Sequence, residues 1–162
     1  MATISKIKEI RKDGKMIDES LTLTKLIQMG WLPSKIIEIK WEFDGKTISL
    51  KSDYGFLNRV TDDRQHLAVM EDIDPTGAVC EFRIYDGHGK LQRIIPNQIP
   101  LRNNERTGMF RNFRPPQVKT PTALGAVFDA DADPTGTLTD GGAWQVDIDS
   151  GTGVISNVRE TR

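Results

Sequence analysis

Basic and aromatic residues alternate between residues 102 and 119, and this segment is the richest in candidate binding groups. Four arginines and a lysine stand against a single acid, Glu105, and two phenylalanines lie among them. Such side chains anchor acidic protein partners, and they can also grip phosphates and stack on bases. In the plainer alternative, the rings fill the core and the arginines pair with the acidic residues 129–149. We predict a surface that binds a protein rather than nucleic acid. Its residues are Arg102, Arg106, Phe110, Arg111, Phe113 and Arg114.

A second stretch, rich in aspartate, has the spacing of a metal site. Its aspartates stand at positions 1, 3, 5 and 12 of a twelve-residue stretch, and they are Asp129, Asp131, Asp133 and Asp140. Calcium prefers several oxygen ligands, and alternate carboxylates on a turning loop can converge on one ion. Against this, position 6 is Pro134 rather than glycine, and no helices are predicted on either side. The first interpretation is a solvated acidic turn, and the alternative is a calcium site. No other cofactor is predicted.

The remaining reactive side chains do not form a catalytic combination. Cys80 lies on the apolar side of a predicted strand, where a buried structural thiol is expected. His66 and His88 lie in or beside predicted turns, and neither is accompanied by a nucleophile elbow or an activating helix N-terminus. No catalytic residue is therefore predicted, and the sequence favours a protein without catalysis of its own.

Residues 66–95 set the pattern for the elements that must position these groups. An apolar run leads into the turn sequence DPTG at 74–77, in which proline and glycine suit the second and fourth turn positions. Residues 78–85 then alternate with a period of two, as expected for a strand with one buried face. The sequence DGHG at 86–89 predicts a second turn and a returning strand. This stretch is predicted to be a three-stranded meander.

Similar hairpins are predicted on both sides of the meander. Residues 35–51 alternate around an Asp-Gly turn at 44–45, and strands at 144–148 and 154–158 flank another Asp/Gly turn. The one predicted helix begins after a threonine cap at Thr22 or Thr24 and ends at Gly30.

The sum is a mainly β fold with one short helix, in which antiparallel hairpins form a sandwich or a small open barrel. Residues 97–122 hold four prolines and no sustained period, so an irregular segment is predicted there. We predict a single domain, 1–162. A possible division separates 1–95 from 123–162, joined by the irregular segment 96–122.

Length and charge set limits on the class of protein. The chain has 162 residues, enough for a core without disulfides, and a formal net charge of −1 with 28% charged residues. This balance predicts no general attraction to nucleic acid or to a membrane. No apolar run approaches the roughly 18 residues of a membrane-spanning helix, residues 1–11 lack the apolar core of a secretion signal, and a single cysteine suits a reducing compartment. We expect a cytoplasmic protein.

Three hypotheses about function follow. The first is a non-catalytic protein-binding module, with an immunity-type inhibitor of a bacterial toxin as its most specific form, because oppositely charged loops on a hairpin scaffold suit electrostatically guided association. The second is a small-ligand-binding β-barrel protein or enzyme, with a site at the barrel mouth lined by Trp41, Tyr54 and Arg83. The third is a calcium-stabilised module.

Overall fold

Antiparallel strands form three separate sheets in the computed structural model of the chain, which describes residues 1–28, 34–101, 104–131 and 142–161. The elements are β1 (Ser5–Arg11), β2 (Met16–Asp18), α1 (Leu23–Gln28), β3 (Ile36–Phe43), β4 (Lys46–Lys51), β5 (Phe56–Val60), β6 (His66–Asp72), β7 (Cys80–Asp86), β8 (Leu91–Ile95), β9 (Gln98–Leu101), β10 (Asn104–Arg114), β11 (Ala123–Ala130), β12 (Gly142–Asp149) and β13 (Ile155–Glu160). The strand orders are β2-β1-β3-β4, β5-β6-β7-β8 and β13-β12-β11-β10-β9. The predicted mainly β, antiparallel fold is confirmed.

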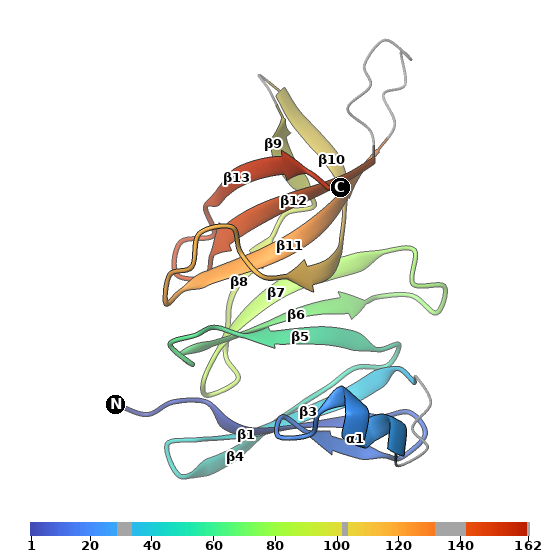
Figure 1. Cartoon of the computed structure of the whole chain (residues 1–162), viewed down its shortest axis with the longest axis vertical. Helices are drawn as coiled ribbons and strands as arrows, with labels where there is room; N and C mark the ends of the chain where they lie inside the picture. The colour runs from blue at the N-terminus through green and yellow to red at the C-terminus, as the bar shows by residue number, and fades with distance from the viewer. Residues whose placement is uncertain (29–33, 102–103, 132–141, 162) are drawn as a thin grey trace.

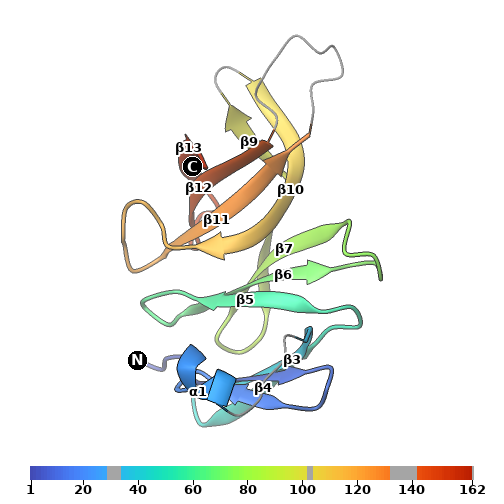
Figure 2. The same ribbon diagram turned by 45° about the vertical axis from the view of Figure 1, so that its right-hand side comes forward.

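The three sheets are stacked, with the β5–β8 sheet in the middle (Figure 1). The β1–β4 sheet lies against one of its faces, and the curled β9–β13 sheet lies over the other (Figure 2). Each interface holds its own cluster of buried apolar side chains. The middle sheet therefore buries apolar residues on both faces, whereas many antiparallel sheets leave one face to water.

Strand β6 contributes side chains to both interfaces. Successive side chains of a strand point to opposite faces. Leu67 and Val69 belong to the cluster shared with the β1–β4 sheet, while Ala68 and Met70 belong to the cluster shared with the β9–β13 sheet. All four are at most 2% exposed. A continuous apolar run, rather than an alternating one, is the pattern expected of a strand that is covered on both sides.

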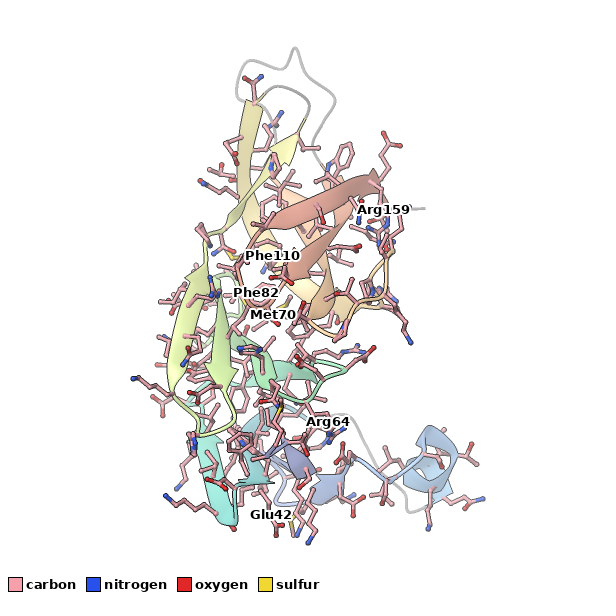
Figure 3. All side chains as sticks on the ribbon, turned by 90° about the vertical axis from the view of Figure 1, so that its left-hand side faces the viewer. Glu42, Arg64, Met70, Phe82, Phe110 and Arg159 are labelled. Carbon is pink, nitrogen blue, oxygen red and sulfur yellow. The ribbon has the colours of Figure 1, made fainter. Side chains whose placement is uncertain are left out.

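Phenylalanine rings join the middle sheet to the β9–β13 sheet (Figure 3). The ring of Phe82 lies edge-to-face against those of Phe110 and Phe113, with centroids 5.1 Å and 5.6 Å away. Phe128 meets Phe110 in the same manner at 4.9 Å. Aromatic pairs in this geometry add to the stabilisation that burial alone provides, so these rings form the centre of the larger core.

The predicted hairpin turns are confirmed where the structure describes them. Asp44 and Gly45 both have positive φ, 52° and 72°, as a two-residue turn that matches the twist of its strands requires. The N–H of Gly77 donates to the carbonyl of Asp74 at 3.4 Å, and the 86–89 turn closes in the same way at 3.0 Å.

The predicted irregular segment at 96–122 is wrong for most of its length. It contains β9 and the eleven-residue β10, which pairs with β11. A register shift between Phe110 and Asn112 interrupts the pairing, so the two buried phenylalanines, 110 and 113, are three positions apart instead of two. This bulge removed the alternation by which the strand would have been recognised.

The domain prediction, with its possible division into 1–95 and 123–162, stays a prediction.

Helix α1 confirms the predicted cap but buries little. The Thr22 Oγ1 accepts a hydrogen bond from the N–H of Lys25 at 3.2 Å. Ile27, on the predicted apolar face, is 63% exposed. The predicted end at Gly30 lies outside the described residues.

Within the described part of the chain, no helix combines the length and apolar character that crossing a membrane requires.

A buried carboxylate fastens the connection at 115–122 to the β9–β13 sheet. Asp147 lies in β12 between two core residues, so its side chain points away from the core, yet the residue is only 4% exposed. Burial alone would raise the pKa of Asp147, but its hydrogen bonds and a nearby guanidinium outweigh burial and lower that pKa. Its donors are the backbone N–H groups of Gln117 (2.8 Å) and Val118 (3.0 Å), the Asn157 amide (2.8 Å) and the Arg159 guanidinium (3.3 Å).

Truncating the central ring tests the packing of the larger core. We expect Phe82→Ala to lower the free energy of unfolding by about 3–5 kcal/mol, because it leaves a cavity beside the rings of Phe110 and Phe113. Urea unfolding followed by circular dichroism measures the change. Ile94→Ala is the control: Ile94 is 50% exposed, so its loss should cost no more than about 0.5 kcal/mol. Equal effects of the two substitutions would contradict the assignment of the core.

Asparagine at position 147 tests the buried carboxylate. We expect Asp147→Asn to destabilise the protein by about 1–3 kcal/mol near neutral pH, because its NH2 group must face a backbone N–H. In the wild type the folded pKa lies below the unfolded value of about 3.9. The contribution of the ionised Asp147 side chain to the free energy of unfolding is therefore present above the unfolded pKa. It is lost as the pH falls through the folded pKa.

Urea unfolding over a pH series, from neutral down to about pH 3, measures this contribution. The loss of stability in acid should be smaller in Asp147→Asn than in the wild type. Asp62→Asn, at an exposed position, should follow the wild type. Parallel curves for wild type and Asp147→Asn would contradict the assignment.

Candidate functional site

The two phenylalanines of the predicted binding surface are core residues. Phe110 is fully buried and Phe113 is 5% exposed, and both pack against Phe82. A partner cannot reach these rings without opening the interface between two sheets. The prediction that they present a binding surface is therefore corrected, and the alternative, in which the rings fill the core, is confirmed.

Among the described arginines of the same segment, Arg111 and Arg114 are exposed and Arg106 is half-buried, and two of them contact the acidic segment that follows. Arg106 Nη2 donates to the carbonyl of Asp131 at 2.9 Å. Arg111 Nε lies 3.5 Å from the carboxylate of Asp129. Arg114 is exposed at the end of β10, and Arg102 lies outside the described residues. Binding of a partner by these arginines stays a prediction.

The predicted calcium ligands are only partly described. Asp129 is paired with Arg111, and Asp131 Oδ2 accepts from the hydroxyl of Thr107 at 3.0 Å. Asp133 and Asp140 lie outside the described residues. Among the residues that the structure does describe, no three potential metal ligands come together. The calcium site stays a prediction.

Neither histidine lies beside the thiol. His66 pairs with Asp86 at one end of the β6–β7 hairpin, whereas Cys80 pairs with Asp72 at the other. The ring of His88 lies edge-on to Phe43, with centroids 4.8 Å apart.

The residues predicted for a barrel mouth also lie in different places. Trp41 is 1% exposed in the smaller core and donates to the carbonyl of Gly87 at 2.7 Å. Tyr54 lies in an exposed loop, and Arg83 on β7 forms ion pairs with two glutamates. These three residues do not form a common site.

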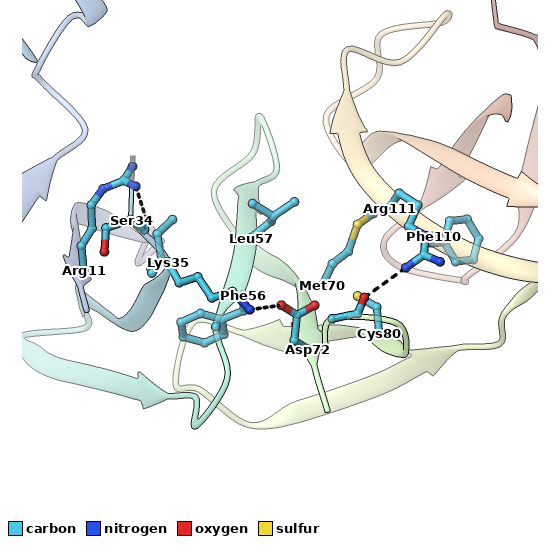
Figure 4. A pocket seen from close by; sticks show the side chains of 13 residues that line it. Arg11, Ser34, Lys35, Phe56, Leu57, Met70, Asp72, Cys80, Phe110 and Arg111 are labelled. Carbon is cyan, nitrogen blue, oxygen red and sulfur yellow. Dashed lines mark hydrogen bonds and ion pairs between the residues drawn. The ribbon is translucent and has the colours of Figure 1, made fainter. Parts of the chain in front are cut away.

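An open groove of about 360 Å³ lies where the three sheets come together (Figure 4). The β1–β4 sheet contributes Arg11, together with Lys35 just before β3. The middle sheet contributes Leu57 and Asp72, and the β9–β13 sheet contributes Arg111. Because this groove brings charged side chains from all three sheets together, it is the candidate functional site and is called here the three-sheet groove.

Three cationic side chains and one carboxylate line the three-sheet groove. The ammonium of Lys35 lies 3.3 Å from Asp72 Oδ2. Arg11 Nη1 donates to the carbonyl of Ser34 at 2.5 Å. Arg111 Nη1 donates to two carbonyls of the β6–β7 turn, at 3.3 Å each. The side chains of Lys35 and Arg111 are 50% and 39% exposed, so a partner can reach both.

Cys80 lies at the floor of the groove, where it is 7% exposed. Burial and the neighbouring carboxylate of Asp72 raise the pKa of its thiol to about 12. The thiol is therefore protonated and a poor nucleophile at neutral pH, which confirms the prediction of a buried structural cysteine.

Among the charged residues of this groove, only Arg111 was predicted from the sequence to bind a partner. Arg11, Lys35 and Asp72 come from separate elements and share no motif. Only the stacking of the sheets brings them together, so pairwise spacing along the chain carries no signal for the site.

No family model matches the chain, and no curated protein matches it. A solved structure, described as "Structure of Tne2 in complex with Tni2", is similar over the full length of both chains, with a TM-score of 0.87 and 28% identity. The stacked arrangement is therefore shared with a protein of known structure. That neighbour is found in complex with a protein partner.

Labelling of the single cysteine tests its burial directly. We expect a thiol reagent at about pH 8 to modify native Cys80 far more slowly than the guanidinium-unfolded chain, because the folded thiol is both covered and protonated. The same chain unfolded in denaturant supplies the reference rate. Equal rates in the two states would show that Cys80 is accessible.

Proposed function

We propose that the chain is a non-catalytic protein-binding module that acts as an immunity-type inhibitor, binding a bacterial toxin in the cytoplasm. The observation that carries the proposal is the full-length similarity to a protein solved in complex with another protein. A stack of sheets with two buried apolar clusters, and with a charged groove left open at its surface, suits binding rather than turnover.

The chemistry of the described residues supports the same class. The thiol is protonated and covered, the histidines lie elsewhere, and the groove contains no nucleophile paired with a base. Its charged side chains can still recognise a partner, since charge complementarity guides association and selects among partners.

The test uses the product of the gene next to this one in the source genome. Expressed alone in a bacterial host, that product should arrest growth, and co-expression of this chain should restore growth because the complex blocks the toxin. The two proteins should also co-elute in size-exclusion chromatography. Phe82→Ala, which should weaken the fold, is the control that should lose protection. A neighbouring product that is harmless and does not bind would overturn the proposal.

A further inference from the structure

We infer that the three-sheet groove is the docking site for the partner, and that it receives an acidic segment in which carboxylates flank an apolar side chain. This inference rests on the proposed function, since it names the surface and the partner chemistry for the same binding activity. Three observations carry it: the placement of the charges, the apolar rim between them, and the position of the groove across all three sheets.

The cations of the groove are placed at both of its ends. Arg11 lies at one end and Arg111 at the other, with the Lys35–Asp72 pair between them (Figure 4). Glu9, 4.0 Å from Arg11, and Asp129, 3.5 Å from Arg111, screen these charges in part. Arg111 keeps donor capacity, because its Nη2 makes no hydrogen bond to any described residue. Carboxylates of a partner are the groups that the exposed Lys35 and Arg111 side chains hold most strongly, whereas the Arg11 side chain is only 14% exposed.

Apolar side chains occupy the space between the charges. Leu57 is 40% exposed at the rim and offers a partner apolar surface, whereas Met70 and Phe110 lie behind it and are at most 2% exposed. An apolar side chain of the partner placed there would lose its contact with water, as the central anchors of protein interfaces do. The groove thus matches a short segment of mixed acidic and apolar residues.

A second apolar surface exists, but it offers no such match. Leu91 and Ile94 on edge strand β8 are 42% and 50% exposed. The charged residue between them, Arg93, donates to the carbonyl of Gly151 in the β12–β13 turn and so is directed to the opposite side of the sheet. The cation on the same side as Ile94 is its cross-strand partner Arg83, which is already held by Glu71 and Glu81. The β8 edge therefore suits an acidic segment less well than the groove, and it supplies a control for the experiment.

Matched substitutions separate the two surfaces. Leu57→Asp places a charge in the groove, and Leu91→Asp places the same charge on an equally exposed leucine outside it. Lys35→Glu reverses the charge of a groove residue whose ammonium lies 3.3 Å from the carboxylate of Asp72. Lys6→Glu reverses a cation on β1 that is 3.2 Å from one carboxylate, Glu42, and lies outside the groove. Circular dichroism and thermal melting are used to check that each of the four variants is folded.

Isothermal titration with the neighbouring gene product measures the effect. We expect Leu57→Asp and Lys35→Glu to raise Kd at least ~10-fold, and Leu91→Asp and Lys6→Glu to leave it within ~3-fold of the wild type. Wild-type affinity in both groove variants, or a loss confined to Leu91→Asp, would overturn the groove while leaving the proposed function intact.

If the wild type does not bind that gene product, the result counts against the proposed function. The chemistry of the groove is then tested separately by a peptide titration. The probe is a short peptide of alternating glutamate and leucine, with a lysine–leucine peptide as its control, followed by NMR of the isotope-labelled chain. Shifts of the Arg11, Lys35 and Arg111 signals with the acidic peptide alone would support the groove chemistry. Shifts confined to β8, or the absence of shifts at millimolar peptide, would refute it.

Discussion

The burial of one strand on both of its faces is the constraint on which the structure depends. Strand β6 sends Leu67 and Val69 into one interface and Ala68 and Met70 into the other. Because the side-chain period of a strand is two, a shift of one residue would exchange these sets and place every side chain in the wrong interface. The sheets above and below thus both pack against this strand, and any site formed between the sheets depends on its register.

The sequence predicted the parts of this arrangement that local chemistry determines. Asp44-Gly45 and the 74–77 turn were recognisable because their backbone conformations favour few residue types. The stacking was not recognisable, since apolar alternation shows that a face is buried but not what covers it. Strand β10 was missed because a bulge between Phe110 and Asn112 interrupts the period.

The basic segment, residues 102–119, shows why a prediction from composition assigned two core phenylalanines to a binding surface. Its phenylalanines fill the core. Arg111 contacts Asp129 on β11, and Arg106 contacts Asp131, which directly follows β11. Residues that are close together in the sequence point alternately to the two faces of the strand, so they do not form one surface patch. Among the described charged residues of this segment, Arg111 alone lines the three-sheet groove, and the other charged residues there come from elements far away in the sequence.

The ion pairs of the groove are compatible with a partner that replaces them. Exposed pairs such as Lys35–Asp72 contribute no more than about 1 kcal/mol, so a carboxylate of a partner can compete for the ammonium at little cost. The floor, in contrast, belongs to a buried interface, because Met70, Cys80 and Phe110 are at most 7% exposed, and it cannot move without separating two sheets. A groove with a fixed floor and weakly held charges loses little conformational entropy on binding. Affinity there should therefore depend on how well the charges and the apolar side chain of the partner fit the groove.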